Sequence, residues 1–223
     1  MDAVKDFYIS NGEVKATEEW TDEPSGKVIY EVIRIINGKP LFYEEHYERM
    51  KNSFKLSNEK FKISEEKLKE DIDKLVKAND SKIGNIKLTY NTTSKELRGF
   101  FINHSYPTEE MYKNGVSTII YFGERENPNA KVINQNFREA VNNEIKKKEA
   151  YEAILIDRNG FITEGSRSNI FMIRDRKLYT SKVEAVLPGV TRTEIIKMAK
   201  NNGIEVISFG SLYGNITLDD ILA

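Results

Sequence analysis

The chain has 223 residues, of which 39% are hydrophobic and 31% charged, and its formal net charge is −1. This length allows one large domain or two small ones, and the balanced charge gives no support for binding to nucleic acid or to an anionic membrane surface. Cysteine is absent and histidine occurs twice, which excludes disulfides and cysteine-based metal sites and leaves too few ligands for a histidine-rich cluster. We therefore expect no metal site.

The sequence also lacks the marks of membrane or secretory targeting. No apolar run reaches the ~18 residues that suggest a membrane span. Residues 1–6 carry neither the basic start nor the apolar stretch of a signal peptide. These features predict a soluble, cytoplasmic protein.

The first half of the chain mixes strand and helix patterns. Residues 28–36 are rich in β-branched side chains and end at Asn37-Gly38, a pair typical of hairpin turns. A helix is expected to follow, with His46, Met50 and Phe54 on one face. The full set of expected elements is strands over 28–36, 40–43, 85–91 and 98–103 and helices over 44–56 and from an N-cap at Ser64.

The second half begins with an expected strand over 116–122 and a polar connection over 123–130. The elements expected after it are a long polar helix over 134–148, strands over 152–157, 169–173 and 204–209, and a helix over 191–201 followed by Gly203. We place the domain boundary at the polar connection. It divides the chain into an N-terminal α+β domain, residues 1–122, and a C-terminal domain, residues 123–223.

The most informative stretch runs from Glu164 to Arg192. It contains the segments EGSRSNIF (164–171), LYT (178–180) and LPGVTR (187–192). Thr191 and Glu194 have the spacing of a capping box ahead of an apolar helical pattern. A helix N-terminus offers free backbone N–H groups and the positive end of the helix dipole, and Gly189 lets the backbone approach a ligand closely. We therefore expect this end of the run to bind an anion such as phosphate.

As a whole, this run resembles the signature of the class IV pyridoxal-phosphate-dependent aminotransferases, which include branched-chain and D-amino-acid aminotransferases and aminodeoxychorismate lyase. The resemblance extends over residues 28–223. It implies the two-domain α/β (α+β) fold of the fold-type-IV enzymes, pyridoxal 5′-phosphate as cofactor, and a homodimer. Such a cofactor needs a lysine, a partner for its pyridine nitrogen, a phosphate site and a substrate pocket.

The resemblance identifies Lys131 as the catalytic lysine that forms the Schiff base and later shuttles the proton. In the family this lysine precedes the strand that leads to the Glu-Gly motif, and here Lys131 lies twenty residues before Tyr151, where that strand is expected to begin. The spacing from Lys131 to Asn134 also matches the D-amino-acid aminotransferase and lyase branches. Most lysines of this chain are surface charges, so a solvated lysine ahead of a helix is the alternative.

The resemblance also assigns the cofactor contacts. Glu164 would face the pyridine nitrogen and keep the ring protonated, and Arg49, in EEHYERM (44–50), would hold the phosphate through its planar guanidinium. Val190 and Thr191 would give backbone N–H groups to the phosphate, and Thr191 its hydroxyl. Leu187 would pack behind the ring.

Three residues are candidates for the substrate pocket. Tyr30 and Arg34 lie on a strand that resembles the substrate side in this family. Arg167 stands where the family commonly has a small residue. It could bind a substrate carboxylate or point to solvent.

Three departures from the family pattern bear on activity. The Gly-Asp-Gly turn that usually precedes the strand of Tyr30 is replaced by PSGK (24–27), and the carboxylate-binding arginine of the D-amino-acid branch is missing from KLTYN (87–91). Family members usually continue with a strand and a Gly/Ser/Thr-rich loop after the point where this chain reads LDDILA (218–223). We therefore expect a fold that is shortened at its C-terminus, with an open sheet edge.

The predicted function is a pyridoxal-phosphate-dependent aminotransferase that acts on an amino-acid or keto-acid substrate through a Lys131 Schiff base. No nucleic-acid or membrane partner is expected. The alternatives are a branched-chain transaminase within the same class, an aminodeoxychorismate lyase, or a truncated homologue that folds and dimerises without turnover. Lys131, Glu164 and Arg49 favour an enzyme, whereas the C-terminal ending favours the inactive homologue.

Overall fold

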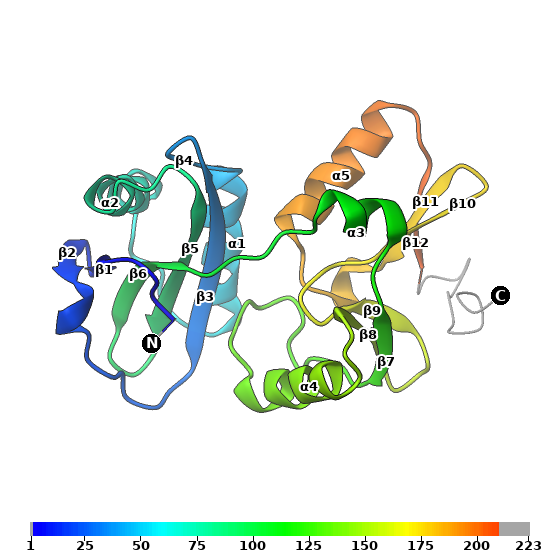
Figure 1. Ribbon diagram of the computed structural model, residues 1–223, viewed down its shortest axis with the longest axis horizontal. Coiled ribbons are helices and arrows are strands. Elements are labelled where there is room, and N and C mark those ends of the chain that lie inside the picture. Colours follow the sequence, from blue (N-terminus) through cyan, green and yellow to red (C-terminus); the bar gives the residue numbers. More distant parts are fainter. Residues whose placement is uncertain (1, 210–223) are drawn as a thin grey trace. The chain divides into compact units, whose positions relative to one another are not determined.

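The computed structural model describes residues 2–209 and shows two compact units (Figure 1). One unit contains the residues up to Tyr106 together with Ala130–Ile133, and the other contains Pro107–Asn129 and the residues from Asn134 onward. The short piece around Lys131 thus packs within the first unit, although its neighbours in sequence belong to the second. The domain boundary expected between residues 122 and 123 stays a prediction.

The first unit is built around an antiparallel sheet with the strand order β2-β1-β6-β5-β3-β4. Its strands are β1 Phe7–Ser10, β2 Glu13–Ala16, β3 Val28–Ile36, β4 Lys39–Pro40, β5 Gly84–Asn91 and β6 Glu96–Ile102. β3 pairs along its length with β5, so that Tyr30 lies opposite Thr89 and Arg34 opposite Asn85. Because side chains alternate across a strand, Tyr30 and Arg34 share one face of the sheet and Glu31 lies on the other.

Two helices, α1 Tyr43–Leu56 and α2 Glu65–Ala78, pack on the Glu31 face and enclose an apolar core with the sheet. The predicted inner face of α1 is confirmed, because His46, Met50 and Phe54 are buried. The predicted start of α2 is also confirmed. The Ser64 side chain accepts a hydrogen bond from the Lys67 N–H, which is the geometry of an N-cap.

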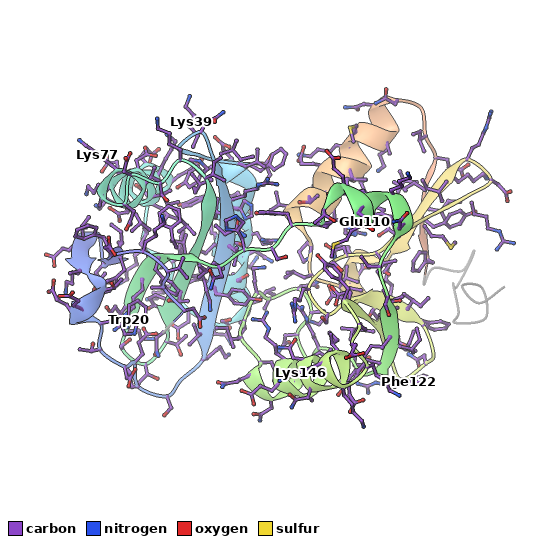
Figure 2. All side chains as sticks on the ribbon, viewed as in Figure 1. Trp20, Lys39, Lys77, Glu110, Phe122 and Lys146 are labelled. Atoms are coloured by element: carbon purple, nitrogen blue, oxygen red, sulfur yellow. The ribbon has the colours of Figure 1, made fainter. Side chains whose placement is uncertain are left out.

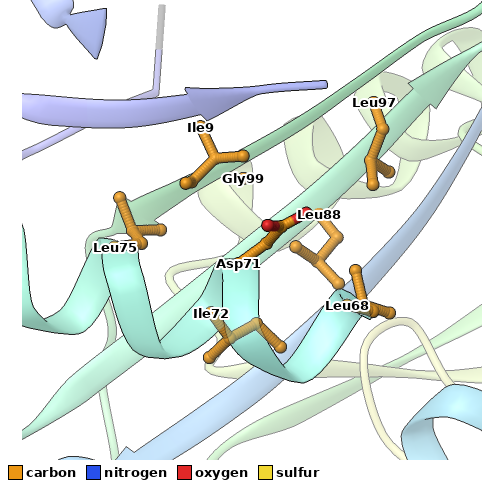
Figure 3. Close-up of a pocket in the computed structure, with 8 residues that line it drawn as sticks. All are labelled: Ile9, Leu68, Asp71, Ile72, Leu75, Leu88, Leu97 and Gly99. Atoms are coloured by element: carbon orange, nitrogen blue, oxygen red, sulfur yellow. The ribbon is translucent and has the colours of Figure 1, made fainter. Parts of the chain in front are cut away.

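A small cavity lies between α2 and the sheet (Figure 3). Its open space is about 10 Å³, the room of a single water molecule. Its lining is apolar apart from Asp71, which is buried on α2 and accepts a hydrogen bond from Lys67 Nζ at 2.7 Å. Gly99 of β6 also lines the cavity and has no side chain to fill it. The cavity is therefore a packing gap and not a substrate site.

The β1–β2 hairpin is an element that the sequence patterns above do not predict. Its turn is Asn11-Gly12, the same dipeptide signal as at residues 37–38, and both turn residues have positive φ, 48° and 89°. Its strands have four residues each, which is too few for an alternation of apolar and polar residues to be recognised. β4 is shorter than expected, because Phe42 adopts a φ of 51° at the N-cap position and turns the chain into α1.

Within the described residues, the second unit contains two three-stranded sheets with the orders β7-β8-β9 and β10-β11-β12. The strands are β7 Thr118–Phe122, β8 Glu152–Ile156, β9 Ile162–Gly165, β10 Phe171–Arg174, β11 Lys177–Ser181 and β12 Val206–Phe209. The helices are α3 Glu109–Asn114, α4 Gln135–Lys147 and α5 Val190–Asn201. α4 packs on β7 and β8 through Val141 and Ile145.

The expected elements of the second half that are confirmed are β7, β8, β10, β12, α4 and α5, each within two residues of its predicted bounds. Asn134 caps α4 by accepting a hydrogen bond from the Phe137 N–H, and Gly203 follows the end of α5 with a φ of 71°. β9, β11 and α3 are not predicted. They have four to six residues, and segments of that length carry little periodicity.

The predicted capping box at the start of α5 is wrong. The helix begins at Val190, its N-cap is Gly189 in an extended conformation, and no side chain caps it. Thr191 therefore lies inside the first turn, where it cannot serve as an N-cap with Glu194 at the third helical position. The reason is tertiary: Gly189 packs directly against Asn169, which fixes the helix start two residues before the position that local sequence favours.

The charged surface agrees with the interleaved charges of the sequence. Lys39 and Lys77 in the first unit and Lys146 in the second are exposed (Figure 2). Within residues 2–209, no helix is both long enough and apolar enough to cross a membrane.

Candidate functional site

Lys131 lies on a short piece of backbone that runs along the start of β3. The Tyr30 N–H donates to the Lys131 carbonyl at 2.9 Å, and the Lys131 N–H donates to the Ser53 hydroxyl on α1 at 3.1 Å. The Lys131 Nζ lies 4.8 Å from the centre of the Tyr30 ring. Sheet and helix thus fix the lysine from two sides, which an ordinary solvated lysine does not require.

Glu31 is a buried carboxylate on the helix-covered face of β3. It is 1% exposed, and Arg49 donates to both its oxygens, from Nε at 2.9 Å and from Nη2 at 2.5 Å. His46 Nδ1 lies 3.2 Å from the same carboxylate. Burial by itself would raise the pKa of Glu31, but the charge of Lys131 and the contacts with His46 and Arg49 outweigh it and lower the pKa to about 2. Glu31 is therefore ionised, bound to Arg49 and influenced by the charge of Lys131.

Glu164 is a second buried carboxylate and lies on β9 of the second unit, 3% exposed. Its Oε2 accepts hydrogen bonds from the Leu187 N–H at 3.0 Å and from Asn169 Nδ2 at 3.4 Å. Asn169 also donates to the Leu187 carbonyl at 2.9 Å, and Arg125 Nε lies 3.3 Å from Glu164 Oε1. The motif residues 164, 169 and 187 are thus joined in one network that fixes the carboxylate.

The start of α5 has the features expected of an anion site. Because no side chain caps this helix, the first backbone N–H groups, at Val190 and Thr191, remain available at its positive end. Arg192 of the same turn is buried and donates to the Ser181 carbonyl at 2.7 Å and to the Thr180 hydroxyl at 3.3 Å. These bonds attach the helix start to β11 and so fix the N–H groups in space.

Gly189 leaves no room for a side chain at this point, because an added Cβ would lie 2.0 Å from Asn169 Oδ1. Gly189→Ala is therefore expected to push Asn169 away from Leu187 and to lower the free energy of unfolding by about 1–3 kcal/mol. Urea denaturation at neutral pH measures the change. Lys200→Ala, at an exposed position of the same helix, should stay within ~0.5 kcal/mol of the wild type, and an equally small change for Gly189→Ala would contradict the packing argument.

Glu152 on β8 holds the loop that follows Glu164. Its carboxylate accepts hydrogen bonds from the Ser166 N–H at 3.0 Å, the Ser166 hydroxyl at 2.5 Å and the Ser168 hydroxyl at 3.0 Å. Gly165 is needed in this loop, since a Cβ there would lie 2.1 Å from Ser168 Oγ. One carboxylate therefore sets the shape of the chain after Glu164.

The three candidate substrate residues lie in different settings. Tyr30 is 6% exposed and contacts Lys131 as described above. Arg34 is exposed, and its guanidinium lies 3.9 Å from the centre of the Tyr106 ring. Arg167 is exposed and donates to a side-chain oxygen on α4 at 2.8 Å. Of these three, Tyr30 is the one that contacts another candidate residue in the described part of the chain.

The structure therefore gathers the candidate residues within each unit. In the first unit, Arg49 binds Glu31 and Tyr30 contacts Lys131, and the second unit holds Glu164, Leu187, Val190 and Thr191. Sequence reasoning passed over Glu31, Arg125 and Glu152, whose importance lies in partners far along the chain. No group of three or more acidic or histidine side chains that could hold a metal occurs within residues 2–209.

Comparison with known proteins gives consistent matches. The family profile described as "Amino-transferase class IV" matches residues 28–223. Over 192 residues the chain is 31% identical to a probable branched-chain-amino-acid aminotransferase of Rickettsia typhi, covering 80% of this chain and 67% of that protein. It is also 31% identical over 197 residues to a D-alanine aminotransferase of Listeria monocytogenes, covering 81% and 68%. The chain thus spans about two thirds of the length of these relatives.

Among solved structures, a branched-chain aminotransferase of the archaeon Thermoproteus uzoniensis, solved with norvaline, has a TM-score of 0.84 and 21% identity, covering 98% of this chain and 80% of that one. This likeness confirms the predicted fold-type-IV architecture. The C-terminal segment 218–223, on which the prediction of a shortened end depends, lies outside the described residues.

Proposed function

We propose, from the premise that this chain belongs to the class IV aminotransferases, that it is a pyridoxal-phosphate-dependent aminotransferase acting on an amino acid through Lys131. Enzymes of this family use pyridoxal 5′-phosphate. The observation that carries the proposal is the setting of Lys131: its backbone is bonded to β3 and α1, and its amine lies beside Tyr30 and in the field of ionised Glu31.

The residues of each unit fit such a cofactor. In the second unit, the uncapped start of α5 suits a phosphate, the fixed carboxylate of Glu164 suits a protonated ring nitrogen, and Leu187 offers an apolar side chain to the ring. In the first unit, Lys131 provides the amine. A simple anion site would need neither the lysine nor the buried carboxylate.

When bound, the cofactor supplies an electron sink for the carbanion at the substrate α-carbon. Glu164 would offer a negative charge to the ring nitrogen, which favours the protonated ring. Lys131 would hold the cofactor through its amine, and the same amine would move the proton of the substrate α-carbon. Arg49 balances the charge of Glu31 through two hydrogen bonds, so that the lysine amine can exist uncharged without leaving a buried carboxylate unpaired.

The phosphate contacts are proposed to come from Val190, Thr191 and Arg49. The first two offer backbone N–H groups and Thr191 adds its exposed hydroxyl. Glu31 holds the Arg49 guanidinium at both Nε and Nη2, which orients it before a ligand arrives. Arg34 is proposed to lie on the substrate side, with Arg167 as a weaker candidate because α4 already accepts a bond from it.

We further propose that the enzyme is a cytoplasmic homodimer that acts on small amino-acid and keto-acid substrates. The family resemblance supports the dimer, and the composition of the chain supports the location. Sedimentation equilibrium measures the mass in solution, and a monomer at micromolar concentration would contradict the dimer.

The function is tested by adding pyridoxal 5′-phosphate to the purified protein and recording absorbance between about 300 and 500 nm. A visible band is expected for the wild type and for Lys146→Ala, an exposed lysine of α4, but not for Lys131→Ala. Borohydride reduction and peptide mass mapping should then place the cofactor on Lys131. No band in the wild type would reject the enzyme and leave the inactive homologue.

Candidate donors separate the possible activities. Loss of the band on adding branched-chain L-amino acids or D-alanine, with an amino group appearing on an added keto acid, would identify an aminotransferase and its substrate class. Turnover of aminodeoxychorismate without any keto-acid acceptor would identify the lyase instead.

A further inference from the structure

Arg125 is an arginine of the second unit for which the proposed function has no role. It lies in the polar segment 123–130, and its side chain is 20% exposed. Its Nε lies 3.3 Å from Glu164 Oε1, and its Nη2 donates to the Ser166 carbonyl at 3.3 Å. The guanidinium thus touches both the buried carboxylate and the backbone two residues after it.

The planar guanidinium of Arg125 restricts how Glu164 and the following loop can be arranged. Its donors lie in one rigid plane, so binding Glu164 and the Ser166 carbonyl together fixes the distance between the carboxylate and the loop. The opposite side of the same loop is bound by Glu152, which accepts the Ser166 N–H. Ser166 is therefore held at its N–H by Glu152 and at its carbonyl by Arg125, and a rotation of the Glu164 side chain would break its own contact with Arg125.

The charge of Arg125 acts on Glu164 as well. Together with the hydrogen bonds from Leu187 and Asn169 to Oε2, this cation keeps the carboxylate in one orientation. A carboxylate held in this way would offer its negative charge to a protonated ring nitrogen, and a protonated ring is the stronger electron sink.

We propose that Arg125 is the positioning residue of Glu164: it aims the carboxylate at the place where the ring nitrogen of the cofactor would bind. This inference rests on the proposed function, because it assumes that Glu164 meets a pyridine nitrogen. It assigns Arg125 no contact with the cofactor itself.

The test uses two ligands that differ only at the ring nitrogen. Pyridoxal 5′-phosphate and its 1-deaza analogue, in which that nitrogen is a carbon, are titrated into the wild type, Arg125→Gln and Arg125→Lys. Arg125→Gln removes the charge but keeps a donor for the Ser166 carbonyl. Arg158→Gln is the matched control, because Arg158 is an 80% exposed arginine of the same unit that pairs with Glu124.

Arg125→Gln is expected to weaken pyridoxal 5′-phosphate binding about tenfold and to change binding of the deaza analogue less than about twofold. Arg125→Lys should recover most of the loss, and Arg158→Gln should behave as the wild type. If Arg125→Gln does not fold, Arg125→Met carries the same expectation. Equal weakening of both ligands would show a merely structural role and overturn the proposal, as would no weakening of either. A wild type that binds neither ligand would instead overturn the proposed function.

Discussion

Lys131→Ala is expected to lower kcat for amino transfer by about a thousandfold or more, the range typical of general bases and covalent nucleophiles. The Lys131 amine is proposed both to hold the cofactor and to move the α-proton. Alanine removes that amine, so both roles are lost. The Lys131 backbone bonds to Tyr30 and Ser53 do not involve the side chain, so the fold should persist. The measurement is steady-state turnover with a donor found in the absorbance experiment.

The loss can be assigned to the amine by rescue. Small primary amines added to Lys131→Ala should restore part of the rate, because they can reach a space that the lysine side chain vacates. Lys146→Ala provides the surface control and should retain full turnover. Retention of more than about a tenth of the wild-type kcat by Lys131→Ala would contradict its role as proton shuttle.

Glu31→Gln is expected to produce the largest loss of stability at neutral pH, about 3 kcal/mol. The pKa of Glu31 is lowered from 4.5 to about 2, which corresponds to about 3 kcal/mol of stabilisation of the ionised form. The carboxylate is almost fully buried, so solvent screens the interaction little. The amide would remove the negative charge that faces Arg49 at this contact, which is costly in a buried setting.

The sign of the pH dependence follows from the lowered pKa. Ionised Glu31 contributes its full stabilisation above pH ~4.5 and loses it progressively as the pH falls toward ~2. Urea unfolding at a series of pH values should therefore show the gap between wild type and Glu31→Gln shrinking across this window. Glu66→Gln, an exposed position of α2, should show no comparable gap. A gap of the same size at pH 7 and at the acid end would contradict an electrostatic origin.

Much of this protein could be predicted from its sequence because the relevant signals are local. β3 stops at Asn37-Gly38, α2 starts at Ser64, and α4 starts at Asn134 because turn and capping preferences act over a few residues. The family could also be recognised from one continuous segment, because its signature lies between Glu164 and Arg192. The residues of that run are spaced so that Glu164, Asn169 and Leu187 meet in one network.

Contacts between residues far apart in the chain could not be predicted in this way, because they depend on the tertiary structure. Glu31 meets Arg49 across 18 residues, and Arg125 meets Ser166 across 41. No period or dipeptide marks such pairs, because a charged side chain in a strand or a polar segment looks the same whether it faces solvent or a distant partner. The start of α5 at Gly189 has the same cause. Gly189 packs closely against Asn169 and α5 starts there instead of at a cap on Thr191, because the helix start follows this tertiary contact and not the capping preference of the local sequence.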